Sequence, residues 1–125
     1  MIILDTESTG QKENQICQLA YIRYDGGTAC AINEFYAVDS MNEYAAEVNG
    51  FSVAQLAQLS GGTRFKERAE TISGQLSGHM LIGHNVSSDI KVLRDEFRRA
   101  GVPFSPARKF CTMNHFTHIL NINQA

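Results

Sequence analysis

Two acidic residues near the start of the chain, Asp5 and Glu7, have the spacing of paired metal ligands. They follow a short apolar run at 2–4 that predicts a buried strand, and Gly10 then ends the segment. Side chains two residues apart point to the same side of a strand, so both carboxylates should project together. Like charges this close resist ionisation, and a divalent cation such as Mg²⁺ or Mn²⁺ removes that cost. The alternative is a solvated strand-to-loop junction with ordinary surface acids.

A third acidic residue, Asp89, lies at a second position where such chemistry is expected. Residues 80–82 predict another buried strand, 83–85 end it, and Ser87 or Ser88 should cap a helix over 89–100. Sites in mixed α/β sheets gather where strands end and helices begin, so Asp89 is expected to face the first two acids. The alternative is a first-turn charge that acts only on the helix dipole.

The remaining segments predict the elements that would position these acids. An Asp25-Gly26-Gly27 turn joins strands at 16–24 and 28–38, which form a three-stranded meander with the first strand. A short helical turn is expected within 39–49. Gly74 lies inside the helix predicted at 64–76, where glycine is an unfavourable residue. The other expected elements are a helix from the Ser52 cap to about 59, a helix at 64–76 capped by Thr63, a strand at 109–111 and a final helix from Thr112.

The length of the chain indicates one domain over residues 1–125, and the predicted mixture of strands and helices makes its fold class α/β. Hydrophobic residues make up 43% and charged residues 19% of the 125 residues, which is typical of a soluble globular protein. No apolar run approaches the roughly 18 residues of a membrane span, and no signal peptide is evident. The cysteines are odd in number and lack Cys-x-x-Cys spacing, which predicts buried thiols in a reducing compartment and a cytoplasmic location.

The net charge of −2 excludes a global basic field for nucleic acid, so such a partner must be held by a local patch or through metal ions. A basic region does occur late in the chain, although a solvated helix face accounts equally well for its first three members. Its residues are Arg94, Arg98, Arg99, Arg108 and Lys109.

Two segments carry a family resemblance. Leu-Asp-Thr-Glu-Ser-Thr-Gly at 4–10 and Gly-His-Asn-Val-Ser-Ser-Asp-Ile-Lys-Val-Leu at 83–93 resemble the first two motifs of the DEDD exonuclease superfamily. The closest group is the DnaQ-like branch, which contains polymerase proofreading subunits and ribonuclease T. Segments 48–52 and 110–113 resemble two further stretches of that branch, in the same order. The resemblance implies a ribonuclease H-like mixed sheet, with an antiparallel three-strand meander plus parallel strands, flanked by helices.

The resemblance also implies an activity, which is hydrolysis of single-stranded DNA or RNA from its 3′ end by two Mg²⁺ or Mn²⁺ ions. It implies that Asp5 bridges both metals, that Glu7 holds the metal carrying the attacking water, and that Asp89 orients the second metal. Which nucleic acid is cleaved stays open. The residues implied to contact the terminal nucleotide are Thr6, Ser8, Thr9, Gly50, Phe51 and Asn85.

The chain departs from the family in its last part. The family has a third motif with a fourth carboxylate and a general-base His a few residues before it, yet no acidic residue follows Glu96. We interpret His115 and His118 as ordinary helix residues and His84 as a hydrogen-bonding structural residue. In addition, Ser88 replaces the aromatic residue that commonly precedes the second-motif Asp.

We therefore expect residues 1–125 to match about the first two-thirds of a DnaQ-like domain, with weak or no turnover. Three explanations remain open: a fragment of a longer parent chain, a truncated gene product, or a site completed by another chain. Exposed apolar surface would then favour a homo-oligomer. The alternative function is a non-catalytic nucleic-acid-binding or protein-interaction module that keeps the exonuclease fold.

Overall fold

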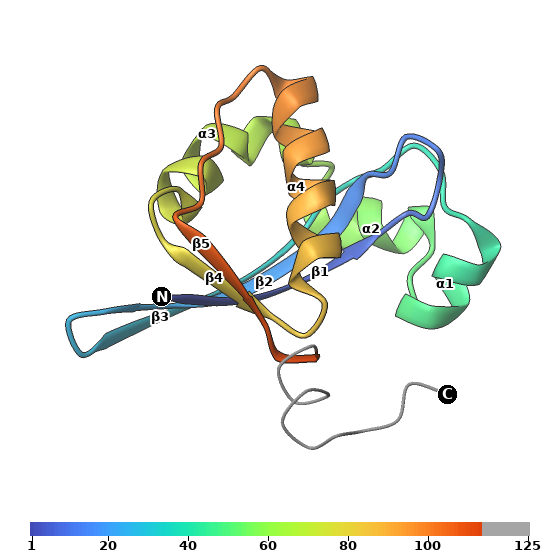
Figure 1. The fold of residues 1–125 in the computed structure, drawn as a ribbon. Coiled ribbons are helices and arrows are strands. Elements are labelled where there is room, and N and C mark those ends of the chain that lie inside the picture. The colour runs from blue at the N-terminus through green and yellow to red at the C-terminus, as the bar shows by residue number, and fades with distance from the viewer. Residues whose placement is uncertain (114–125) are drawn as a thin grey trace.

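Alternation of apolar and polar residues builds a five-stranded sheet within residues 1–113, the part of the chain that the computed structural model describes (Figure 1). The strands are β1 (Ile2–Ser8), β2 (Ile16–Asp25), β3 (Thr28–Phe35), β4 (Met80–Gly83) and β5 (Arg108–Cys111). The helices are α1 (Glu43–Asn49), α2 (Val53–Ser60), α3 (Phe65–Leu76) and α4 (Val86–Ala100).

The strand order is β3-β2-β1-β4-β5, with antiparallel pairs on one side of β1 and parallel pairs on the other. The hairpin between β2 and β3 turns at Gly26 and Gly27, whose φ angles of 51° and 87° favour glycine. β4 reaches its place beside β1 only after the three intervening helices, as parallel neighbours require a long connection. The predicted meander and mixed ribonuclease H-like sheet are confirmed.

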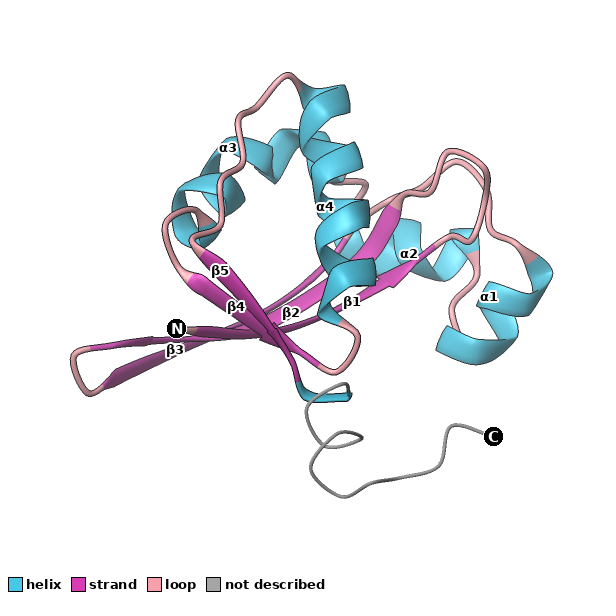
Figure 2. Cartoon of the chain, viewed as in Figure 1, coloured by secondary structure: helices cyan, strands magenta, loops and turns pink. Residues whose placement is uncertain are grey.

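One face of the sheet is covered by α3 and α4 (Figure 2). Helix α4 carries a stripe at three- and four-residue spacing, and its Leu93 and Phe97 pack with Ile2 and Leu4 of β1. Burial of each such side chain contributes roughly 1.5–3 kcal/mol. This packing fixes the start of α4 beside the end of β1, which is where the site lies.

The opposite face of the sheet exposes apolar side chains. Ile3, Ile22 and Tyr24 are 41%, 37% and 40% exposed, and no helix within residues 1–113 packs over them. Strand alternation places Asp5 and Glu7 on the same face as Ile3. The two acids therefore lie beside an apolar surface.

Several element boundaries differ from the predicted ones. β1 continues to Ser8 because Asp5 and Glu7 pair with Ala20 and Gln18 of β2, so both acids lie inside the strand. A bulge follows at the Glu7/Ser8 step, where Ile16 and Cys17 are both buried. The strand predicted to reach residue 38 ends at residue 35.

The first residues of the helices show which predicted capping residues were correct. Ser52 caps α2 and forms a reciprocal capping box with Gln55, as its spacing predicts. Helix α3 is preceded by Arg64 rather than by the predicted Thr63 cap. Helix α4 begins three residues before the predicted position, after Asn85, so the predicted caps Ser87 and Ser88 lie inside the helix. The predicted final helix with His115 and His118 lies outside the described residues.

The three cysteines are free thiols in different surroundings. Cys17 is buried, which raises the pKa of its thiol to about 11, and Cys111 is half-buried. Cys30 is exposed, so the prediction of buried thiols is wrong for this residue, because it lies on the edge strand β3. Within residues 1–113, no helix has both the length and the apolar content needed to cross a membrane.

Candidate nuclease site at the end of β1

A pocket of about 290 Å³ opens where β1 ends and α4 begins. It brings together two of the three predicted acids, Asp5 and Asp89, although they are 84 positions apart in the sequence. The third acid, Glu7, is not among the lining residues. The pocket is lined by Asp5, Thr6, Ser8, Asn14, His84, Asn85, Ser88, Asp89 and Val92.

Asp89 is tied directly to β1. Its Oδ1 accepts hydrogen bonds from the Thr6 backbone N–H at 3.1 Å and from the Thr6 hydroxyl at 2.6 Å. Close approach of α4 to the sheet is possible because residue 83 is glycine: a Cβ there would lie 3.2 Å from the Leu4 carbonyl oxygen and 3.3 Å from Asp89 Oδ2. Thr6 therefore orients Asp89 within the structure.

The carboxylates influence one another electrostatically. Burial raises the pKa of Glu7, and the negative charges of Asp5 and Asp89 raise it further. Burial also raises the pKa of Asp89, as does Asp5, against the opposing effect of the two Thr6 hydrogen bonds. The negative charge of Asp5 thus opposes the ionisation of both Glu7 and Asp89.

This donor set fits a divalent cation in charge and chemistry, because carboxylate oxygens suit Mg²⁺ and Mn²⁺ and a cation removes the repulsion. Within residues 1–113, however, no group of three or more His, Cys, Asp or Glu side chains is arranged to hold a metal. Strand alternation places the side chains of Asp5 and Glu7 on one face of β1 and that of Thr6, which donates to Asp89, on the other. Of the three acids, Asp5 and Asp89 line the pocket and Glu7 does not.

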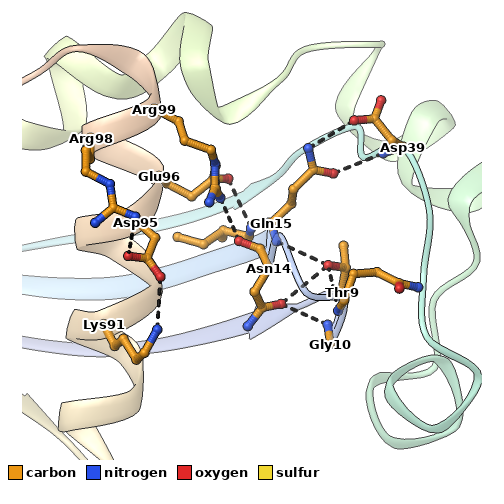
Figure 3. A network of polar contacts seen from close by, with 12 residues as sticks. Thr9, Gly10, Asn14, Gln15, Asp39, Lys91, Asp95, Glu96, Arg98 and Arg99 are labelled. Atoms are coloured by element: carbon orange, nitrogen blue, oxygen red, sulfur yellow. Dashed lines mark hydrogen bonds and ion pairs between the residues drawn. The ribbon is translucent and has the colours of Figure 1, made fainter.

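The loop after β1 forms the wall of the pocket and is fixed by its own polar side chains (Figure 3). Asn14 Oδ1 accepts from the Gly10 backbone N–H at 2.8 Å and lies 3.3 Å from the Thr9 hydroxyl. The Thr9 hydroxyl also accepts from the backbone N–H groups of Gln11 and Gln15. Thr9 is fully buried, so the predicted nucleotide contact by its hydroxyl is replaced by a structural role.

A buried acid on α4 holds this loop to the helix. Glu96 accepts from the Ile16 backbone N–H at 3.1 Å and pairs with Arg99 at 2.7 Å. Arg99 also donates to the Asn14 carbonyl oxygen at 2.6 Å, as Figure 3 shows. Sequence reasoning missed Glu96 and Asn14. The available signal was the position of Glu96 between Leu93 and Phe97 in the apolar stripe of α4.

The other predicted site residues divide into two groups. Ser8 and Asn85 line the pocket, and the Asn85 side chain makes no capping hydrogen bond to α4. Gly50 ends α1 in a left-handed conformation, and Phe51 packs edge-on against Phe35 with ring centroids 5.3 Å apart. Neither of these two lines the pocket.

His84 lines the pocket and makes the kind of contact predicted for it. Its Nδ1 lies 3.3 Å from the Thr112 hydroxyl, within hydrogen-bond distance. Its backbone carbonyl accepts from the Cys111 thiol at 3.3 Å, so the residue joins the end of β4 to the end of β5.

The mutual repulsion of the acids predicts a pH dependence of stability in the absence of metal. Since the pKa values of Glu7 and Asp89 are raised by folding, the folded chain binds more protons, and stability falls as pH rises through these pKa values. Asp5→Asn removes one cause of both shifts. We expect it to raise the free energy of unfolding by roughly 0.5 kcal/mol at pH 7 and by less at pH 4.

Urea unfolding in EDTA at both pH values measures this difference. Glu70→Gln, which removes an exposed carboxylate on α3, is the matched control and should show no such pH-dependent gain. An equal gain from Asp5→Asn at the two pH values would contradict the proposed repulsion.

Comparisons with known proteins bear on the family and the fold of the chain. The family model RNase_T, described as Exonuclease, matches residues 2–123. No curated protein matches the chain. Solved structures with the same fold include exonuclease I in its apo form, with a TM-score of 0.78, 15% identity, and coverage of 95% of this chain and 30% of that one.

Escherichia coli exonuclease I in complex with a dA16 oligonucleotide gives a TM-score of 0.78 at 15% identity, over 95% of this chain and 29% of that one. The metal-free E. coli exonuclease I–single-stranded DNA complex gives 0.79 at 15% identity, with the same coverage. The chain thus spans about 30% of the length of the structures that it matches.

Proposed function

The chain belongs to the exonuclease family of the DEDD superfamily whose model, RNase_T, matches residues 2–123, and we propose from this that it is a metal-dependent 3′–5′ exonuclease domain of the DnaQ-like type. The single observation that carries the proposal is the pocket that both Asp5 and Asp89 line. Glu7 lies close enough to both for their charges to raise its pKa. We propose that residues 1–125 form one domain, which hydrolyses the phosphodiester bond nearest a 3′ end.

In the proposed reaction, water attacks the phosphorus of the terminal phosphodiester. The bond from phosphorus to the 3′ oxygen of the preceding nucleotide breaks, that oxygen takes a proton, and a nucleoside 5′-monophosphate leaves. Asp5, Glu7 and Asp89 would hold Mg²⁺ or Mn²⁺, which supplies charge neutralisation and an activated water when bound. Ser8 and Asn85 are proposed to contact the terminal nucleotide, while Thr6 keeps Asp89 in place.

A single-stranded substrate is supported by the solved complexes of exonuclease I with single-stranded DNA and with dA16. Turnover by residues 1–125 is proposed to be weak, because no carboxylate follows Glu96 and the family's general base and fourth ligand act together with the other three. The exposed apolar face around Ile3 and Ile22 supports self-association of this chain.

A second candidate function is a non-catalytic nucleic-acid-binding or protein-interaction module. Two observations favour it. Asp89 Oδ1 already accepts from both Thr6 donors, and no group of three His, Cys, Asp or Glu side chains within residues 1–113 is arranged to hold a metal. The two functions differ in whether the acids bind a metal ion.

Calorimetric titration of Mn²⁺ into the chain tests the proposal. We expect saturable binding that Asp5→Ala abolishes and that Glu70→Ala, an exposed carboxylate on α3, leaves unchanged. Absence of binding by the folded chain would favour the interaction module instead.

The direction of hydrolysis is tested with 5′-fluorescein single-stranded DNA and RNA in Mn²⁺. We expect a ladder of products that shorten one nucleotide at a time from the 3′ end. Internal cuts, or release of the labelled 5′ nucleotide as the first product, would contradict the proposed polarity.

A further inference from the structure

A groove of about 400 Å³ runs between α4 and the edge strand β5, outside the pocket described above. Its lining includes three apolar residues, Ile90, Pro106 and Ala107, here called the apolar floor, and four basic residues, here called the basic rim. These are Lys91, Arg94, Arg108 and Lys109.

The basic residues of this rim are mostly free of acidic partners. Six of the eleven basic residues of the chain form ion pairs within residues 1–113. Of the four basic residues in the rim, only Lys91 has such an ion pair in that part of the chain. Three of the five basic residues without an ion pair in that part of the chain, Arg94, Arg108 and Lys109, therefore line one groove of a protein with net charge −2. A concentration of uncompensated charge at one place attracts anions.

Two of these side chains are held in position. The Arg94 guanidinium lies 5.9 Å from the centroid of the Phe104 ring, a cation–π geometry that leaves its N–H groups available. Lys109 Nζ donates to the Ser87 hydroxyl at 3.1 Å, in the first turn of α4, where the helix dipole also favours negative charge. Pre-positioned donors lose less side-chain entropy when an anion binds.

The groove is linked to the candidate hydrolytic pocket through a third depression that adjoins both. Ser88 and Val92 border both that pocket and a neighbouring depression of about 320 Å³, and Lys91 borders both this depression and the groove. A strand that enters the pocket by its end can thus pass over the first turns of α4 into the groove.

A basic depression on the other side of α4 offers less charge. It contains Arg64, Lys66 and Arg99, but Arg64 is paired with Asp39 and Arg99 with Glu96. Lys66 is the only one of these three that forms no ion pair within residues 1–113. The α4–β5 groove therefore has more basic side chains without an ion pair, and it should attract a polyanion more strongly.

We propose that the α4–β5 groove binds the backbone phosphates of a single-stranded nucleic acid, away from the end that lies at the carboxylates. The proposal rests on the proposed function for its choice of ligand. The basic rim would contact phosphates, and the apolar floor would contact sugars. An acidic peptide offers similar charge but has no reason to reach the carboxylate pocket.

Fluorescence anisotropy of a 5′-fluorescein dT16 oligonucleotide tests the groove in EDTA, so that neither metal binding nor cleavage contributes. Arg108→Gln should weaken binding roughly 3–5-fold at low salt, and Arg94→Gln/Arg108→Gln more than 10-fold. Removal of one side chain that neutralises a phosphate should reduce the slope of log K against log salt by about 0.7. Lys66→Gln removes one uncompensated charge outside the groove and is expected to change affinity less than 2-fold.

Three results would overturn the inference: no dT16 binding by the wild-type chain, equal losses of affinity from Arg108→Gln and Lys66→Gln, or an acidic octapeptide that binds the groove more tightly than dT16. Urea unfolding of each variant excludes a folding defect as the cause of weaker binding. The Mn²⁺ titration reports separately on the carboxylates, so failure of the groove and failure of the proposed function are distinguishable.

Discussion

Asp89→Ala is expected to lower the free energy of unfolding by about 2 kcal/mol and to abolish saturable Mn²⁺ binding. Asp89→Asn should weaken Mn²⁺ binding without lowering the free energy of unfolding to the same extent. The alanine variant leaves the Thr6 backbone N–H and hydroxyl, which lie 3.1 and 2.6 Å from Asp89 Oδ1 in the wild type, without their acceptor. Loss of hydrogen bonds to a charged group at a site only 7% exposed costs about 1.5–3 kcal/mol.

The asparagine variant separates the two roles of this residue. Its side-chain carbonyl can accept from both Thr6 donors, and it removes a carboxylate whose pKa is raised by burial. Its stability without metal should therefore lie within about 0.5 kcal/mol of the wild type or above it, while its affinity for Mn²⁺ falls at least about 10-fold.

Urea unfolding and calorimetry of the two variants measure these effects, with Ser88→Ala, the neighbouring residue in the pocket, as the control. If Asp89→Asn bound Mn²⁺ as tightly as the wild type, Asp89 would not be a metal ligand. If Asp89→Ala were as stable as the wild type, the contact with Thr6 would have no structural value.

Much of the fold could be predicted because its signals are local. The Asp25-Gly26-Gly27 turn marks the β2–β3 hairpin, and the Ser52/Gln55 pair marks the start of α2. The stripe of α4 predicts which face packs on the sheet. In each case the residues that determine the element lie within a few positions of one another.

The missed features depend on contacts between distant segments. The start of α4 at Val86 has no side-chain cap, so the local search for a capping serine placed it three residues late. The pairing of Asp5 with Ala20 and of Glu7 with Gln18 extends β1 past both acids, which no local pattern reveals. Likewise, only the folded chain shows that the Thr9 hydroxyl is enclosed in the loop.

The basic region was predicted from clustering in the sequence, and the structure divides it. Arg98 and Arg99 form ion pairs with Asp95 and Glu96, one turn earlier on α4. The other members, Arg94, Arg108 and Lys109, come from α4 and β5, the opposite walls of one groove. Charge clustering in the sequence thus indicated a basic surface, while its shape and its free charges required the packing of α4 against β5.

Glu96→Ala is expected to destabilise the chain by about 2–4 kcal/mol and to loosen the wall of the pocket. The substitution leaves the Ile16 backbone N–H without its acceptor and Arg99 without its ionic partner. An unsatisfied buried donor costs about 1–3 kcal/mol, and the loss of the ion pair with Arg99, whose side chain is 31% exposed, adds to this. Since Arg99 also holds the Asn14 carbonyl, its release should free the loop that carries Asn14 into the pocket.

Asp95→Ala is the matched control, because Asp95 is the adjacent acid on α4 and pairs with Lys91 and Arg98 on the exposed side of the helix, as Figure 3 shows. It should cost no more than about 0.5 kcal/mol. Urea unfolding gives both values, and hydrogen exchange of the Ile16 and Thr9 amides reports on the loop, with faster exchange expected only in Glu96→Ala. Equal destabilisation by the two variants would show that Glu96 acts as an ordinary surface charge, and the loop would then be held by Thr9 and Asn14 alone.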